Sequence, residues 1–308
     1  MKIITPVVVI AYNRPLKTLR LLNSLKKIKL SKIIFICDGP KQNNNLDKNK
    51  CKKVNNLIKK IKFNCKKEYI ISKKNLGLKN RIYSGLNQVF KKYDRAIILE
   101  DDCIPNFSFF YFCEKVLKIY SKNKKIAGIS GNNFLNQNIN NSFYFSKYSS
   151  IWGWATWSRV WKKIDINIKF WPKYKNSLMW INSCPDIVER HFWNNLFDNV
   201  YKNKINSWAY SYLLNNFYHK RLTVVPRYNL VKNIGFGKGS TNTKHYNKFF
   251  FPPVKKIEKK LSIPSKIIQN KKGDIIDFAR VYGGGRRNSY PIKFFFMLYV
   301  FFLNLFTK

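Results

Sequence analysis

Acidic residues are scarce in this chain. Asp and Glu together number 15, against 59 Lys and Arg in 308 residues, which gives a formal net charge of +44. Disorder driven by charge normally comes with few aromatic residues, but this chain holds 25 Phe, 18 Tyr and 8 Trp, enough to fill a core. An acidic disordered chain is therefore excluded and a folded protein is expected. The length suits one large α/β domain with an appendage, or two small domains.

Long apolar runs are also missing. No stretch reaches the roughly 18 to 20 apolar residues of a helix that crosses a bilayer. The short apolar run at the N-terminus is interrupted by Thr5 and Pro6, and no small-residue cleavage site follows it. We therefore expect no secretory signal and a cytoplasmic protein.

Cysteine pairs at the two-to-four spacing of zinc sites and redox dithiols are absent. The cysteines are Cys37, Cys51, Cys65, Cys103, Cys113 and Cys184. We expect free thiols in a reducing compartment. The basic excess can mark a nucleic-acid or membrane partner, but the lysines are spread among Asn, Ile, Phe and Tyr, the residues of A/T-rich codons. Genome composition, acidic lipids and phosphate-bearing substrates all remain open explanations of the charge.

Short apolar strands alternate with amphipathic helical patterns in the first 120 residues. Apolar runs at 6–11, 33–37, 68–72 and 95–99 predict strands, and the patterns at 15–27, 46–63, 75–89 and 109–120 predict helices. We expect Asn75 to cap the third helix. Four strands alternating with helices favour an α/β fold with a doubly wound, mostly parallel, Rossmann-like sheet.

The second half of the chain is rich in aromatic residues, and every tryptophan lies beyond residue 151. We expect helices at 155–164, 185–201 and 208–218, and a strand at 222–225. Trp157 and Trp161 are spaced as core residues of the first of these helices.

Polar residues follow three of the predicted strands, and ligands of open parallel sheets bind at the carboxyl ends of strands. The most informative group is Glu100-Asp101-Asp102. Three adjacent carboxylates repel one another unless a cation neutralises them, and oxygen ligands favour Mg²⁺ or Mn²⁺ bridging to substrate phosphates. The alternative is a solvated acidic turn that stabilises the next helix through its dipole.

Several motifs in this order resemble a known family. They are Val7-Val8-Val9-Ile10-Ala11-Tyr12-Asn13-Arg14-Pro15, Ile36-Cys37-Asp38-Gly39-Pro40, Asn75-Leu76-Gly77-Leu78, Ile97-Ile98-Leu99-Glu100-Asp101-Asp102, Trp152-Gly153-Trp154-Ala155-Thr156-Trp157 and Asn233-Ile234-Gly235-Phe236-Gly237. Together they resemble GT-A-fold nucleotide-sugar glycosyltransferases, in particular bacterial sugar transferases related to the N-acetylglucosaminyltransferase I group. The resemblance covers roughly residues 5–245. It implies a nucleotide-sugar-binding part at 1–130, an acceptor-side part of the same domain at 131–248, and a C-terminal basic and apolar extension at 249–308.

The resemblance also implies roles for single residues at the donor site. Asp38 would receive the uracil or ribose of a UDP-sugar, with Tyr12 and Arg14 lining the base pocket. The acidic triplet matches the family's Asp-any-Asp element, so that Asp102 would bind Mn²⁺ or Mg²⁺ while Glu100 and Asp101 contact ribose or sugar.

Three further residues are candidates for donor binding. Arg81 would reach a phosphate or pair with an acid, the alternative being an exposed helix arginine. Trp152 and Trp154 would flank the donor or acceptor sugar, because aromatic faces complement the C–H side of pyranose rings.

The chain departs from the family at the position of the catalytic base. Relatives carry the base in a Trp-Asp segment, whereas the matching stretch here is Ser207-Trp208-Ala209-Tyr210. The nearest other acids, Asp186, Glu189 and Asp198, are weak candidates with helix-surface roles as the alternative. Where the relatives have Thr-His-Thr, this chain has Thr241-Asn242-Thr243, with His245 nearby. No residue is therefore assigned as the base.

The implied activity is metal-dependent, inverting transfer of a sugar from a UDP-type donor to a glycan or lipid-linked acceptor, as in surface polysaccharide synthesis. Ala209 supports an alternative, a catalytically impaired sugar-nucleotide or glycan-binding homologue. A basic nucleic-acid-binding protein is supported by charge alone and is not favoured, because the lysines are dispersed.

The apolar segment Phe294–Phe306 has two interpretations, a helix that closes the core or an interfacial anchor on an acidic membrane. Lys293, Arg286 and Arg287 lie beside it, and 13 residues are too few to span. We favour the anchor, which places the protein peripherally on the inner face of the membrane.

Overall fold

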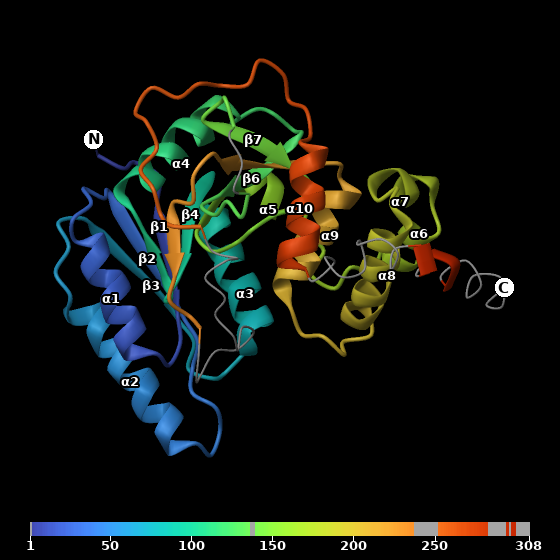
Figure 1. Cartoon of the computed structure of the whole chain (residues 1–308). Helices are drawn as coiled ribbons and strands as arrows, with labels where there is room; N and C mark the ends of the chain where they lie inside the picture. Colours follow the sequence, from blue (N-terminus) through green and yellow to red (C-terminus); the bar gives the residue numbers. More distant parts are fainter. Residues whose placement is uncertain (1, 136–138, 237–251, 283–293, 296, 300–308) are drawn as a thin grey trace.

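The computed structural model describes residues 2–135, 139–236, 252–282, 294–295 and 297–299 (Figure 1). Its centre is an eight-stranded sheet with the order β3-β2-β1-β4-β8-β6-β9-β7. In Figure 1, α1 and α2 lie on the left of the sheet, and α6, α7 and α8 form a helical lobe on the right.

The first half of the sheet is parallel, as the sequence predicts. Its strands are β1 (Val7–Ala11), β2 (Lys32–Cys37), β3 (Lys66–Ile71) and β4 (Arg95–Glu100), and the connecting helices are α1 (Pro15–Leu25), α2 (Asn45–Lys60) and α3 (Gly77–Lys92). β1 pairs in parallel with both β2 and β4, and all five of its residues are buried. A strand covered on both faces reads as an unbroken apolar run. The predicted α/β fold with a large, mostly parallel sheet is confirmed.

The second half of the sheet has both parallel and antiparallel strand pairs, and one sequence prediction is wrong there. The predicted helix at 155–164 is instead strand β8 (Trp154–Trp157) followed by the short helix α5 (Ser158–Trp161). β8 lies between β4 and β6 and is antiparallel to both. Sheet pairing therefore overrides the local helical spacing, although Trp157 and Trp161 are buried in the core as expected.

Three more strands complete the large sheet and two form a small one. They are β6 (Ile126–Ser130), β7 (Phe143–Ser146) and β9 (Leu222–Pro226) in the large sheet, and β5 (Cys103–Pro105) with β10 (Val231–Asn233) in the small one. Strands from residues 1–130 and from residues 131–248 thus belong to the same sheet. The small sheet is antiparallel and brings residues 231–233 beside the segment that follows the acidic triplet.

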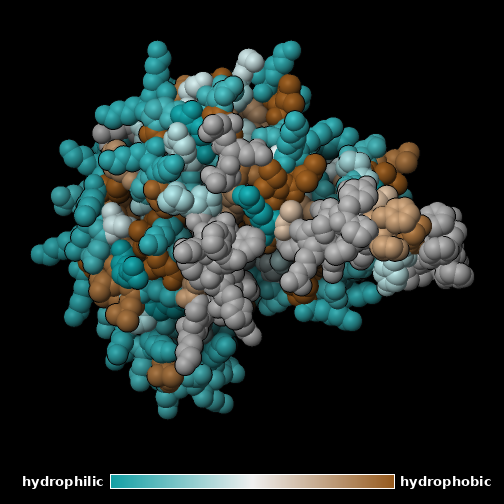
Figure 2. All heavy atoms as spheres, in the orientation of Figure 1, coloured by the Kyte–Doolittle hydropathy of each residue, from teal (hydrophilic) through white to brown (hydrophobic). Residues whose placement is uncertain are grey.

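The remaining helices build the lobe and cover the sheet. They are α4 (Phe107–Ile119), α6 (Trp171–Lys175), α7 (Leu178–Ser183), α8 (Ile187–Tyr201), α9 (Trp208–Tyr218) and α10 (Lys271–Val281). The lobe has its own aromatic core, in which Trp171, Trp180 and Trp193 are almost fully buried. On the face in Figure 2, hydrophilic residues predominate and hydrophobic residues gather in scattered patches.

All six cysteines are free thiols, as predicted. None of the helices in the described part of the chain has the length and apolar character needed to cross a membrane.

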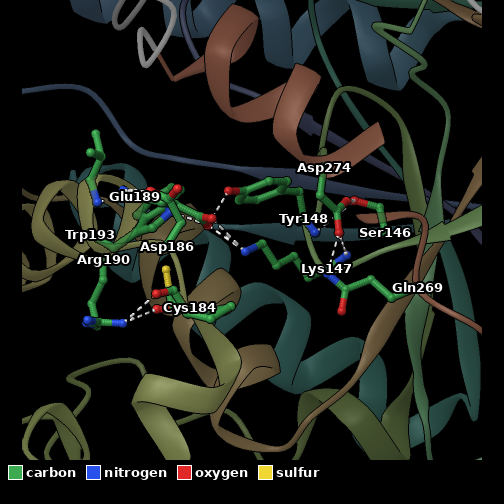
Figure 3. Close-up of polar contacts among 12 residues, drawn as sticks. Ser146, Lys147, Tyr148, Cys184, Asp186, Glu189, Arg190, Trp193, Gln269 and Asp274 are labelled. Atoms are coloured by element: carbon green, nitrogen blue, oxygen red, sulfur yellow. Dashed lines mark hydrogen bonds and ion pairs between the residues drawn. The ribbon is translucent and has the colours of Figure 1, made fainter. Parts of the chain in front are cut away.

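Helix α10 docks on β7 through buried polar groups (Figure 3). The Asp274 carboxylate accepts hydrogen bonds from Ser146 Oγ at 2.5 Å and from Gln269 Nε2 at 2.6 Å. One turn later, Asp277 is only 5% exposed, and its Oδ1 has no hydrogen-bond partner among the described residues. Burial and the neighbouring Asp274 raise the pKa of Asp277 to about 7, against a lowering effect of Arg280.

We expect the stability of the fold to fall as pH rises from about 4 to about 7 because of Asp277. The folded protein keeps this proton up to about pH 7, whereas the unfolded chain releases it near pH 4. The stabilising contribution is therefore complete below pH 4 and is lost as pH rises through 7, by about 4 kcal/mol over that interval.

Thermal unfolding of Asp277→Asn should show a correspondingly smaller pH slope, with the variant gaining on the wild type as pH rises. Asp94→Asn, at an exposed acid, is the control and should keep the wild-type slope. Equal slopes for wild type and Asp277→Asn would contradict the assignment.

Candidate functional site

The polar residues expected at the strand ends do meet at one edge of the sheet. In the parallel register Ala11 lies beside Cys37, and Ile10 lies beside Glu100. The segments that follow β1, β2 and β4 therefore leave the sheet together. They carry Tyr12 to Arg14, Asp38, and the acidic triplet.

Arg14 is the counter-ion of the acidic triplet. Its Nη1 lies 2.8 Å from Asp102 Oδ2 and 3.4 Å from Asp101 Oδ1. Burial raises the pKa of Asp101 to about 7, an effect that Arg14 opposes and Asp102 reinforces. Burial, Asp102 and Asp101 raise the pKa of Glu100 to about 8. The triplet is thus not a solvated acidic turn, because Asp101 is buried and Arg14 pairs with both Asp101 and Asp102.

Asp102 is the residue of the triplet to which the family resemblance assigns a cation. The described residues contain no group of three or more His, Cys, Asp or Glu side chains that could hold a metal ion. The Asp102 side chain is 13% exposed. Magnesium in nucleotide sites is commonly held by one or two carboxylates together with substrate phosphates. Asp102 fits that pattern, provided that a donor supplies the other oxygen ligands.

A loop from the second half of the chain packs directly on Asp102. The backbone N–H of Ile234 donates to the Asp102 carbonyl oxygen at 2.8 Å. At Gly235, a Cβ atom would lie 2.3 Å from Asp102 Oδ2, so only glycine fits there without a shift. This contact explains why the Asn233-Ile234-Gly235 motif accompanies the acidic motif in the sequence.

Asp38 organises the start of α3. Its carboxylate accepts hydrogen bonds from the backbone N–H groups of Leu76 at 2.9 Å and Gly77 at 3.0 Å. The predicted cap, Asn75, instead donates from Nδ2 to the Gly39 carbonyl at 2.8 Å. The capping prediction for Asn75 is therefore wrong, because a carboxylate at the end of β2 reaches the free helix N–H groups first.

Arg81 is buried rather than exposed. Only 5% of the residue is accessible, and its Nε and Nη2 have no hydrogen-bond partner among the described residues. Burial lowers the pKa of Arg81, while the charge of nearby Asp38 raises it. The interpretation as an exposed helix arginine is wrong. Because unpaired buried guanidinium donors are costly, the side chain is suited to an anion such as a phosphate.

Tyr12 is held by an acid that the sequence analysis missed. Its hydroxyl donates to Asp47 Oδ2 at 2.5 Å, and Asn13 Nδ2 donates to Asp47 Oδ1 at 2.6 Å. Burial and the Asp47 hydrogen bond raise the pKa of Tyr12. Asp47 lies at the start of the helix predicted at 46–63. Asn44 followed by an acid three residues later is a helix-start pattern, and Asn44 does cap α2.

The two candidate sugar-binding tryptophans have different positions. Trp154 is 2% exposed and stacks on Trp208 in the core with ring centroids 5.6 Å apart. A core position leaves no ring face for a sugar, so the expectation for Trp154 is corrected. Trp152 is partly exposed and lines a pocket of about 430 Å³.

The three weak candidates for the base all have structural partners. Asp186 caps α8 through the N–H groups of Val188 and Glu189. Figure 3 shows Lys147 and Tyr148 pointing at Glu189, whose Oε1 lies 2.6 Å from Lys147 Nζ and 2.5 Å from the Tyr148 hydroxyl.

Asp198 accepts from Trp171 Nε1 at 2.8 Å and from Lys175 Nζ at 2.7 Å. Glu189 and Asp198 belong to helix α8, and Asp186 caps it. This helix lies in the lobe on the right of Figure 1, apart from β4. The structure therefore does not bring these acids to the edge where Asp102 lies.

Ala209 is the second residue of α9 and is partly buried against the main core. The motif residues Gly237, Thr241-Asn242-Thr243 and His245 lie outside the described residues, as do Arg286, Arg287 and Lys293.

No protein-family model matches the chain, and no curated protein matches it. Solved structures with partial similarity include HddC from Yersinia pseudotuberculosis, with 14% identity, coverage of 55% of this chain and 86% of that chain, and a TM-score of 0.34. UDP-glucose pyrophosphorylase complexed with UDP-glucose is 10% identical, with coverage of 73% of this chain and 93% of that chain and a TM-score of 0.36.

A third structure is a putative glucose-1-phosphate thymidylyltransferase from Bacillus anthracis. It is 12% identical, with coverage of 52% of this chain and 74% of that chain and a TM-score of 0.30. Scores this low carry no argument about activity, so the proposals below depend on the residues of this chain.

Proposed function

We propose that this protein is a GT-A-type glycosyltransferase that uses a UDP-sugar donor. The observation that carries the proposal is the meeting of Arg14, Asp38, Arg81 and the acidic triplet at the carboxyl ends of three parallel strands. Two guanidinium groups and a carboxylate at one edge are the groups that a nucleoside diphosphate requires.

Charge development explains how these residues would act in transfer to a hydroxyl acceptor. Negative charge grows on the departing diphosphate while positive character grows on the anomeric carbon. Arg14 and Arg81 would bind the phosphates, and preorganised charges of this kind stabilise a developing anion. A Mn²⁺ or Mg²⁺ ion held by Asp102 would supply further charge stabilisation there.

Base and ribose recognition would involve the ends of β1 and β2. Tyr12 is oriented by its hydrogen bond to Asp47, which presents a fixed ring for the uracil. Asp38 accepts backbone hydrogen bonds, and a carboxylate has about four lone-pair sites. A third backbone N–H, that of Gly39, also donates to Asp38 Oδ1 at 2.9 Å, so one of these sites is left for the uracil or a ribose hydroxyl.

The proposal is tested by measuring UDP release with Mn²⁺ across several UDP-sugars and saccharide acceptors. We expect release that depends on both the acceptor and the metal. Nucleotide binding without release from any combination would support the second candidate, a sugar-nucleotide-binding homologue, which Ala209 favours because no carboxylate stands at the expected base position.

We also propose that the C-terminal segment docks on an acidic membrane. Phe294, Phe295, Met297, Leu298 and Tyr299 are between 38% and 64% exposed. Exposed apolar side chains on a chain of +44 net charge suit a surface with apolar depth and negative headgroups. The lipid would be the natural place to meet a lipid-linked acceptor.

The prediction is that the protein sediments with phosphatidylglycerol vesicles and less with phosphatidylcholine vesicles. Replacing Phe294, Phe295 and Leu298 by serine should reduce binding at least tenfold, because each buried side chain contributes roughly 1.5–3 kcal/mol. Ile263→Ser with Ile268→Ser, also at exposed sites, should bind as the wild type does. Binding that survives the triple substitution would rule out this segment as the anchor.

A further inference from the structure

The pocket beside Trp152 has the features of a built saccharide site. Trp152 lies between Phe134 and Phe236, with ring centroids 5.6 Å and 5.8 Å apart and both pairs edge to face. The other lining residues are Asn132, Asn229, Val231, Lys232, Asn233, Pro252, Pro253 and Val254. Its volume of about 430 Å³ is within the range of small-molecule sites.

Asn132 gives the pocket an acceptor that lacks a donor. The residue is 2% exposed, and its Oδ1 has no partner among the described residues. Its Nδ2 faces Asn229 Oδ1 at 3.3 Å and the Val231 carbonyl at 3.4 Å.

Neighbouring hydrogen bonds determine which atom of the Asn132 amide is Oδ1 and which is Nδ2. The Val231 carbonyl can only accept, and Asn229 uses its own Nδ2 to donate to the Pro252 carbonyl at 2.8 Å. Both neighbours of Asn132 Nδ2 are therefore acceptors, so Nδ2 must be the donor and Oδ1 must be the unsatisfied acceptor. A buried acceptor of this kind is costly unless a ligand donates to it.

The pocket adjoins the acidic edge through a single short loop. Asn233, on the pocket wall, accepts the Gly235 N–H at 2.5 Å through its Oδ1. Gly235 in turn packs on Asp102 Oδ2, as described above. A ligand in the pocket would thus lie next to the place where the proposed diphosphate sits.

We propose that this pocket binds the acceptor saccharide by an uncharged, hydroxyl-bearing ring. The three aromatic rings contact its C–H surface, and one ring hydroxyl donates to Asn132 Oδ1. Among the described lining residues there is no acid, and Lys232 is the charged one. At Asn132 Oδ1 itself a phosphate or carboxylate would bring no donor, whereas a hydroxyl donates a hydrogen bond. The role of this saccharide as acceptor rests on the proposed function, whereas the binding of a saccharide in the pocket does not.

The test is saturation-transfer NMR with the methyl glycosides of glucose, galactose and N-acetylglucosamine, and with glucuronate as the charged comparison, all without UDP. We expect binding of at least one neutral glycoside and weaker binding of glucuronate. Asn132→Leu and Trp152→Ala should each weaken glycoside binding at least tenfold. Tyr201→Ala, at an exposed aromatic residue on α8, should leave it unchanged.

The outcomes separate this inference from the proposed function. Glycoside binding by a protein that releases no UDP would overturn the glycosyltransferase and leave the saccharide site standing. UDP release by a protein whose glycoside binding is absent, or is unaffected by the Trp152 and Asn132 substitutions, would overturn the inference. Binding seen only with an intact UDP-sugar would place the donor's own sugar in the pocket and would also overturn it. Because Trp152 is partly exposed, its variant keeps the test valid if Asn132→Leu does not fold.

Discussion

Asp102→Asn should lower UDP release at least 100-fold and abolish the Mn²⁺-dependent part of UDP affinity. The substitution keeps the volume of the side chain and removes the charge that would hold the ion. Metal-free UDP affinity should persist or rise, because Arg14 loses its partner at 2.8 Å and can turn its guanidinium to the phosphates. Calorimetric titration of UDP with and without Mn²⁺ measures both quantities.

Asp94→Asn serves as the matched control for Asp102→Asn, since it removes one carboxylate at an exposed position. It should change neither release nor affinity. If the Asp102 variant retains Mn²⁺-dependent UDP affinity, Asp102 is not the metal ligand. Loss of metal-free affinity as well would indicate that Asp102 supports the nucleotide pocket structurally.

Asp38→Ala should have two large effects. It leaves the N–H groups of Leu76 and Gly77 without their acceptor and removes the negative charge near buried Arg81. Together these changes should destabilise the fold by about 3 kcal/mol. UDP affinity without metal should fall more than tenfold, because Asp38 is the proposed contact of the uracil or ribose.

Asp38→Asn separates the two roles of Asp38. The amide oxygen still accepts one helix N–H, so urea unfolding should show a smaller loss than in Asp38→Ala, while UDP affinity should still fall. Unchanged affinity in calorimetry would mean that Asp38 only caps α3. Unchanged stability in Asp38→Ala would mean that water replaces its hydrogen bonds at no cost.

Local patterns predicted the first half of the fold well. The apolar runs predicted to end at Ala11, Cys37 and Leu99 are strands, because a strand covered on both faces needs only apolar residues. The same patterns placed the acidic triplet and Asp38 at strand ends, and hence at one edge of the sheet.

The same kind of reasoning failed where a residue's partner is distant in sequence. Residues 154–157 form a strand because β4 and β6 offer free edges on either side. Arg81 has ordinary helical spacing, and nothing in that spacing reveals that it is buried beside Asp38. Asp47 lies in the helix predicted at 46–63, and nothing in that pattern reveals that it binds Tyr12.

The sequence by itself determined the alternation of strands and helices, the charge, and the positions of the acids relative to the strand ends, because these depend on neighbouring residues. Only the tertiary structure decided that Arg14 neutralises the triplet, that Trp154 is core while Trp152 lines a pocket, and that Asn132 has an unpaired oxygen. Burial and hydrogen-bond partners are properties of contacts between distant segments, and those contacts exist only once the chain has folded.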